Sequence, residues 1–293
     1  MASAELRLIR RRIKSVQSTM KITRAMELIA TSRIAKAQVR VAQSRPYTNK
    51  MVGVIRNIAA AGGLVHPLLE RRDVETVGVM IVTSDRGLAG GYNTNVMRLA
   101  ERAIAAHHEA GRPTRLYVVG QKANGYFRYR NHQIEQAFLG VTDRPTYNDA
   151  RAIANVLLNE YQEAHVDAVE AYTTRFQSAL TQTAVHWPLL PIEPPDMEDA
   201  GEDASAIGYE FEPSPEEILG RLLPRYLEAT VFGMLLEASA SEHAARRRAM
   251  KAATENAEEL TRVLTREANQ ARQAEITTEI SEIVGGAEAL SGG

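Results

Sequence analysis

The sequence has 293 residues, 44% of them hydrophobic and 24% charged, with a formal net charge of −1. This composition excludes a disordered chain, because it supplies enough apolar surface for one large core or two smaller ones. The absence of cysteine excludes disulfides, thiol switches and thiolate metal sites, and no run of about 18 apolar residues predicts a membrane span.

Charge is distributed unevenly along the chain. Residues 1–50 contain twelve lysines and arginines against two glutamates, whereas residues 193–217 contain ten acids and no lysine or arginine. Such segregation predicts an electrostatically complementary partner or a spatial division of roles. The basic start has the composition of a transit peptide, but its helical periodicity continues through residue 45. We therefore interpret it as part of the folded protein.

The first 60 residues predict a long helix. The heptad seam of a coiled coil is indicated by apolar residues spaced alternately three and four apart: Leu6, Ile9, Ile13, Val16 and Met20. The register then slips, and the apolar positions resume at Ile22, Met26, Ile29, Ile34, Ala37 and Val41. Pro46 marks the end of the helix or a kink, because proline removes a backbone donor and clashes with the preceding turn.

Residues 74–212 predict a central α/β domain. Four short apolar runs are typical of buried strands, at 77–84, 114–120, 134–140 and 166–174. Segments with helical periodicity alternate with them, at 95–110, 121–130 and 147–164. This alternation predicts a Rossmann-like domain with a mainly parallel sheet covered by helices. Residues 184–192 are a further candidate strand, in which Pro188 suits a sheet edge or a strand end.

Residues 213–293 predict a second long helix, with Gly233 the one glycine between Arg225 and Val284. Both terminal helices are longer than the middle domain is wide, so we expect them to project and to pair as an antiparallel coiled coil. An alanine-rich section predicts a slender, weakly held part of this pair: Ala238, Ala240, Ala244, Ala245, Ala249, Ala252, Ala253 and Ala257. Apolar residues then return (Leu260, Leu264, Ile276, Ile280 and Ile283), and Gly285–Gly286 offers a helix stop.

Catalytic motifs are missing from the sequence. There is no phosphate-binding GxxxxGK[ST], no GxGxxG after the first strand, and no HExxH or comparable metal-ligand spacing; His107 and His108 are expected to be exposed. The glycine-rich segment 84–93 stands at a strand-to-helix turn, where a phosphate could bind a helix N-terminus. A tight turn is the commoner reason for such glycines, so we expect Ser84, Asp85, Arg86 and Gly87 to brace this turn or a partner surface.

The basic N-terminal helix has other interpretations. It could be a solvated charged face, or it could bind nucleic acid as basic regions beside a zipper do. The nucleic-acid interpretation is disfavoured, because the basic residues lie along the heptad seam and not before it. An alternative function for the whole chain is an α/β enzyme that binds a small ligand and uses the helices as coiled-coil oligomerisation arms.

Four segments resemble the gamma subunit of F-type ATP synthase, in that family's order and approximate spacing: IKSVQSTMKITRAMELIATSRIAKAQ, SDRGLAGGYN, residues 209–257 and ARQAEITTEISEIVGGAEAL. The resemblance implies a non-catalytic rotor shaft with no cofactor. Its implied partners are the alpha, beta and epsilon subunits and the c-ring, and nucleic acid is not among them. It implies a peripheral position on the cytoplasmic face of the bacterial plasma membrane, with membrane contact only through the complex.

The resemblance also implies site residues. Lys21, Arg24, Met26 and Glu27 match the segment that faces the beta-subunit levers, and Arg246, Arg272 and Gln273 match segments that contact the surrounding ring. The part of the base that lies near the c-ring in the family is matched by Tyr209, Phe211 and Glu212. Ala89 stands where many relatives carry cysteine, and the regulatory insertion of chloroplast members is absent.

Overall fold

The computed structural model describes residues 4–60, 66–193, 212 and 214–291. It contains two long helices, α1 (Ala4–Ala60) and α5 (Pro215–Ser291). Between them lie, in chain order, β1 (Val77–Val82), α2 (Tyr92–Glu109), β2 (Thr114–Val119), α3 (Gln121–Tyr129), β3 (Ile134–Phe138), α4 (Tyr147–Gln162), β4 (Ala168–Phe176) and β5 (Gln182–Leu190). Among these described helices, none has an apolar stretch long enough to cross a membrane.

The chain forms two compact units. One contains residues 1–30 and 247–293, and the other contains residues 31–246, so α1 and α5 each contribute a segment to both. In the first unit the two helices are in contact through Thr23 and Thr254. In the second unit they run antiparallel, because Ile34 packs in one cluster with Ala244, and Ile58 packs in another with Leu219.

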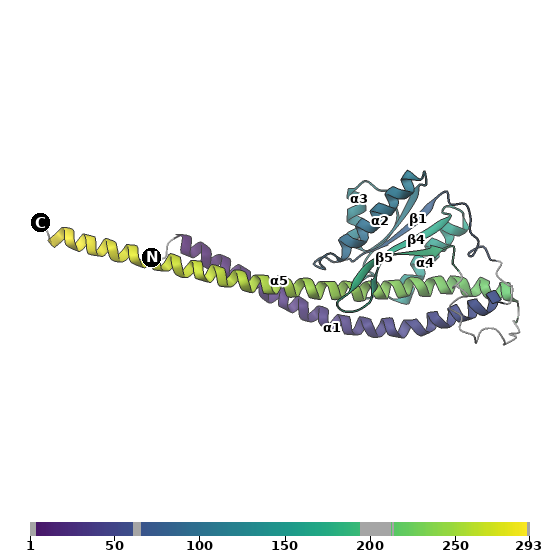
Figure 1. The fold of residues 1–293 in the computed structure, drawn as a ribbon, viewed down its shortest axis with the longest axis horizontal. Helices are drawn as coiled ribbons and strands as arrows, with labels where there is room; N and C mark the ends of the chain where they lie inside the picture. Colours follow the sequence, from purple (N-terminus) through teal and green to yellow (C-terminus); the bar gives the residue numbers. More distant parts are fainter. Residues whose placement is uncertain (1–3, 61–65, 194–211, 213, 292–293) are drawn as a thin grey trace. The chain divides into compact units, whose positions relative to one another are not determined.

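A five-stranded sheet forms the centre of the second unit (Figure 1). The strand order is β3-β2-β1-β4-β5; the first four strands are parallel to one another, and β5 is antiparallel to β4. The mainly parallel sheet and the strand at 184–192 are therefore confirmed. Pro188 lies on the edge strand β5, where a missing backbone donor is tolerated.

Helices cover both faces of this sheet. Side chains alternate between the faces along each strand, so Met80 and Val82 of β1 face α4, α5 and the end of α1, whereas Val79 and Ile81 face α2 and α3. All six residues of β1 are buried, as expected for the central strand of a sheet covered on both sides.

The predicted register slip in α1 is wrong. Ile22 and Ile29 are 60% and 55% exposed, whereas Thr23 and Ala30 are buried. The alternating three-and-four spacing that begins at Leu6 therefore continues through these two positions. The seam is hard to recognise in the sequence, because a threonine and an alanine occupy seam positions where large apolar residues are expected, and isoleucines stand next to them.

The alanine-rich section of α5 is not slender where it lies in the second unit. Residues 238–246 are all buried, so this part of the helix is enclosed on every side. Ala240 and Ala244 lie in a cluster with Ile34 and Val41 of α1 and with Phe176 of β4. Small side chains let the neighbouring elements approach the helix closely. Those neighbours cover the helix, although each alanine side chain buries little area itself.

Three further expectations are corrected. Pro46 does not end α1, which continues to Ala60, and Gly285–Gly286 does not end α5, which continues to Ser291. His107 is not exposed, because its side chain is 13% accessible and its Nε2 lies 3.2 Å from Glu170 of β4. Proline and glycine lower helix stability without forbidding a helix, so a long helix with many other residues can contain them.

Replacing Ala240 by leucine is expected to lower the free energy of unfolding by about 1–3 kcal/mol, because Ala240 is fully buried and the added methylenes have no space. The control is Ala252→Leu on the exposed part of α5, which should change stability by less than about 0.5 kcal/mol. Denaturant unfolding followed by circular dichroism measures both. Equal stabilities of the two variants would contradict the enclosed position of this section.

Candidate functional site

The first unit presents charged and apolar side chains of α1 outward. Lys21 and Arg24 are exposed, and Met26 and Glu27 are half-buried. Arg24 and Glu27 line a groove that Lys251, Glu255 and Glu258 of α5 complete. Leu28 also lines this groove and is 65% exposed, so the surface combines charge of both signs with accessible apolar area. Such a mixed surface is suited to a protein partner.

A hydroxyl pair lies in the seam next to this surface. The Thr23 and Thr254 hydroxyls are 2.8 Å apart, and each also lies within hydrogen-bond distance of a backbone carbonyl of its own helix, that of Met20 and Met250 respectively. One hydroxyl therefore has competing acceptors within reach. The pair satisfies two polar groups in a contact that is otherwise apolar, and this fixes which residues face each other across the seam.

The last part of α5 carries exposed residues on all sides. Arg272 and Gln273 are exposed. Beyond them four large apolar residues are 43–71% exposed and recur at helical spacing: Ile276, Ile280, Ile283 and Val284. A helix with an uncovered apolar stripe can bury it against another chain.

Asp85 organises the turn after β1. Its carboxylate accepts hydrogen bonds from the backbone N–H groups of Gln121, Gly140 and Thr142 at 3.0–3.1 Å, and from the Thr142 hydroxyl at 2.8 Å. Ser84 is held by Asn93, whose side-chain oxygen accepts from the Ser84 N–H at 2.9 Å. Three loops at the carboxyl ends of neighbouring strands are thereby tied together.

Arg246 connects α5 to this turn. The guanidinium is 7% exposed; it donates to the carbonyl of Gly87 at 3.2 Å and forms an ion pair of 2.6 Å with Glu242, one helical turn earlier. Glu242 is 1% exposed, and its second oxygen has no hydrogen-bond partner within the described residues. Burial raises the pKa of Glu242, while the charge of Arg246 opposes that rise.

A second polar group continues the connection to α1. Asp143, which follows β3, forms an ion pair with Arg33 of α1, and its backbone carbonyl accepts from Ser239 of α5 at 3.2 Å. His243 lies 3.8 Å from the Asp143 carboxylate. Burial lowers the pKa of His243 to about 4, so the imidazole is neutral at pH 7.

The structure brings together some of the predicted site residues and separates others. Arg246 lies with the Ser84–Gly87 turn, and Lys21, Arg24, Met26 and Glu27 lie in the first unit with Arg272 and Gln273. Glu212 is exposed, whereas Tyr209 and Phe211 lie outside the described residues. Across the described ranges, no group of His, Asp and Glu side chains could hold a metal ion.

Sequence reasoning missed Glu242, His243, Asp143 and Arg33. The available signal was the segment ASASEHAARRRAM, where charged residues interrupt a run of small ones. A glutamate and an arginine four residues apart on a helix are ordinarily an exposed pair. Here the small neighbours indicate that the helix surface is covered, which makes the same pair a buried one.

The combination of a Rossmann-like domain with two long paired helices is a fold that solved ATP synthase structures also contain. One is a chain of the OSCP/F1/c-ring part of the Euglena gracilis mitochondrial ATP synthase in rotational state 3 (17% identity, TM-score 0.67, covering 98% of this chain and 94% of that chain). Another is a chain of the central stalk and c-ring of the Tetrahymena thermophila mitochondrial ATP synthase (22% identity, TM-score 0.60, covering 79% and 99%).

Sequence comparison gives the family. The ATP synthase family model matches residues 5–290. The ATP synthase gamma chains of Parafrankia sp. and Mycolicibacterium smegmatis are each 47% identical to this chain, with 99% of both chains covered in each case. The chain therefore belongs to the ATP synthase gamma chain family, the non-catalytic rotor subunits of the F-type central stalk.

Replacing Arg246 by methionine is expected to lower the free energy of unfolding at pH 7 by about 3 kcal/mol, because Glu242 is left buried without its partner. The pKa of Glu242 then rises further above its unfolded value, so the folded carboxyl takes up a proton at a higher pH than the unfolded one. The free-energy cost of this protonation falls as the pH approaches the unfolded pKa, so the loss of stability should shrink from pH 7 to pH 5. The double variant Arg246→Met, Glu242→Leu should recover part of the loss. Denaturant unfolding at both pH values measures this, and a pH-independent loss would contradict a buried pair.

Proposed function

We propose that this chain transmits torque between a proton-driven c-ring and the catalytic beta subunits of an F-type ATP synthase. Membership of the gamma chain family carries the proposal, because the family's members are rotor subunits. ATP is made or hydrolysed at sites in the neighbouring subunits. A chain with this role supplies stiffness and shape and needs no phosphate loop of its own.

The parts of the chain have separate roles in this proposal. Residues 1–60 and 213–293 form the shaft, and residues 74–212 form the base. Torque passes from the base to the shaft where α5 is enclosed, because a helix packed on every side cannot turn independently of its surroundings. The buried Arg246–Glu242 pair and the Gly87 carbonyl add polar contacts at the same place.

The shaft is proposed to turn within a ring of alpha and beta subunits. Lys21, Arg24, Met26 and Glu27 are proposed to face the beta-subunit levers, and Arg246, Arg272 and Gln273 the surrounding ring. The exposure of Lys21, Arg24, Arg272 and Gln273 supports direct contact. The burial of Arg246 favours an indirect role, in which it holds the Ser84–Gly87 turn, the proposed partner surface at the base.

The base is proposed to contact the epsilon subunit and the c-ring. Tyr209, Phe211 and Glu212 are the proposed c-ring contacts, and the exposure of Glu212 supports its part in this. The chain would then lie at the cytoplasmic face of a bacterial plasma membrane and touch the membrane only through the complex. Its bacterial relatives support that location.

Purification from membranes in mild detergent tests the function. A tagged copy of the chain is expected to recover the alpha, beta, epsilon and c subunits together with proton-pumping ATPase activity. Membranes with an untagged copy are the control. Recovery of the tagged chain from intact membranes without alpha, beta and c subunits would overturn the proposal.

Reversing the charges of Lys21 and Arg24 to glutamate is expected to reduce ATP-driven proton pumping several-fold relative to ATP hydrolysis, because positive charge there is proposed to meet acidic lever loops. Dye quenching in inverted vesicles measures the ratio of pumping to hydrolysis. The wild-type ratio should also fall with rising salt, since exposed charges are screened beyond about 10 Å at 0.1 M. Lys36→Glu, an exposed change on α1 in the other unit, is the control. Unchanged coupling in the double variant would rule out this contact.

A further inference from the structure

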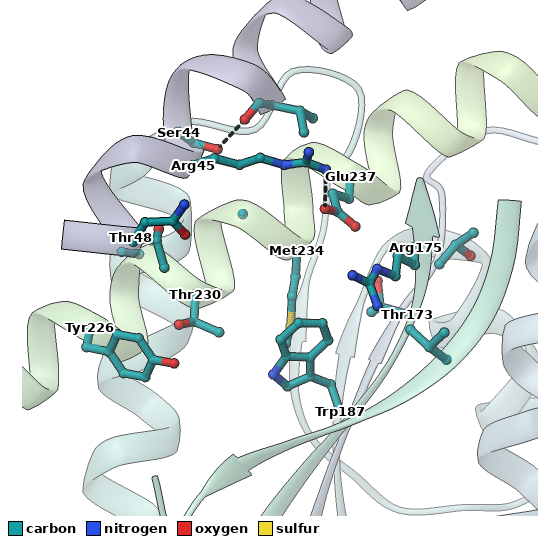
Figure 2. A pocket seen from close by; sticks show the side chains of 16 residues that line it. Ser44, Arg45, Thr48, Thr173, Arg175, Trp187, Tyr226, Thr230, Met234 and Glu237 are labelled. Atoms are coloured by element: carbon teal, nitrogen blue, oxygen red, sulfur yellow. Dashed lines mark hydrogen bonds and ion pairs between the residues drawn. The ribbon is translucent and has the colours of Figure 1, made fainter. Parts of the chain in front are cut away.

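A pocket of about 320 Å³ lies in the second unit, between α1, α5 and the β4–β5 hairpin (Figure 2). One face of the hairpin supplies Thr173, Arg175, Val185 and Trp187, since these positions alternate along paired strands. A volume of this size is within the range of small-molecule sites. None of the contacts that connect α5 to the Ser84–Gly87 turn involves these residues, so the pocket is separate from the site described above.

Gly233 creates part of this space. It is the one glycine of the chain between Arg225 and Val284, and glycine is disfavoured in a helix interior. A Cβ built on Gly233 would meet no atom within 4 Å, so no packed neighbour requires the missing side chain. Gly233 lines the pocket, and the open volume beside it is where a side chain would otherwise lie.

Thr173 and Arg175 bring hydrogen-bond donors to the pocket. The Thr173 hydroxyl is buried, in a residue 3% exposed, and it has no hydrogen-bond partner within the described residues. The Arg175 guanidinium forms no ion pair with another described residue. The carboxylate of Glu237 is already engaged: it lies 3.5 Å from Arg45 and accepts from the backbone N–H of Phe176 at 3.3 Å. A buried hydroxyl and an uncommitted cation are together complementary to an anion.

The apolar lining of the pocket includes an indole ring. Trp187 is 39% exposed and is the single tryptophan of the chain. Met234 and Val185 line the same space. An indole face beside aliphatic and thioether groups favours a planar ring, through stacking and sulfur–aromatic contacts.

We infer that this pocket binds a small planar aromatic anion, with its ring against Trp187 and its carboxylate or sulfonate near Arg175 and the Thr173 hydroxyl. Such a ligand would contact α1, α5 and the hairpin at once. Because it would bind the folded chain and not the unfolded one, it would also raise the thermal stability of the second unit.

The experiment uses the full chain and a matched pair of probes, 2-naphthoate and its neutral analogue 2-naphthamide. Naphthalene absorption overlaps indole emission, so quenching of Trp187 reports binding beside it, and saturation-transfer NMR detects binding anywhere. The expected dissociation constant of 2-naphthoate is about 1 mM or lower, with 2-naphthamide at least about tenfold weaker.

Two variants locate the probe. Gly233→Leu fills the pocket from α5 and is expected to abolish Trp187 quenching by both probes while keeping the helix, because leucine favours a helix more than glycine does. Its control is Gly125→Leu on α3, across the sheet, where a Cβ also meets nothing within 4 Å. Arg175→Gln should weaken 2-naphthoate about tenfold and leave 2-naphthamide unchanged, with Arg102→Gln on α2 as its control.

Three results would overturn the inference: no quenching of Trp187 by either probe, equal affinity for the two probes, or binding that survives Gly233→Leu in a variant whose circular dichroism is that of the wild type. Saturation transfer without quenching would show binding away from Trp187 and would also overturn the inference. Should Gly233→Leu fail to fold, the exposed Arg175→Gln variant decides the outcome, because unchanged 2-naphthoate affinity there contradicts the assigned anion position.

Discussion

The enclosure of α5 between residues 238 and 246 is the constraint on which the second unit depends. A helix can be surrounded on all sides only if its side chains are small or are satisfied where they are buried. Alanines meet the first condition at Ala240 and Ala244, and the pairing of Glu242 with Arg246 meets the second. Because Arg246 also donates to the turn after β1, the same stretch of helix fixes the loops at the carboxyl ends of the strands.

The sheet and its covering helices were predictable because each strand is a short apolar run and each helix has apolar residues at helical spacing. The seam of α1 was harder to follow. Thr23 and Ala30 lie in it although Ile22 and Ile29 are more hydrophobic, because the partner offers a hydroxyl at Thr254 and because exposed isoleucines cost little on a surface. Local hydrophobicity therefore gave the wrong register, and only the facing helix resolves it.

The connecting polar groups were not predictable for a different reason. Asp85 follows a strand and was expected to brace a turn, but its three backbone donors come from segments more than 30 residues away. Glu242 and Arg246 have the spacing of an ordinary surface pair, and burial alone distinguishes them. Sequence gives residue type and spacing, whereas the free energy of an ion pair depends on the dielectric around it, which the rest of the fold determines.

Charged residues consequently serve two purposes that respond differently to solvent. Lys21 and Arg24 are exposed, so any attraction they exert is long-ranged at low salt and weak at high salt. Arg246 and Glu242 are buried, and their interaction is little screened. The proposed role requires both kinds, because contacts with the proposed ring would be broken and remade in each turn, whereas the attachment of α5 to the base would have to hold under the same torque. The distribution of exposed and buried charge along the two helices fits that requirement.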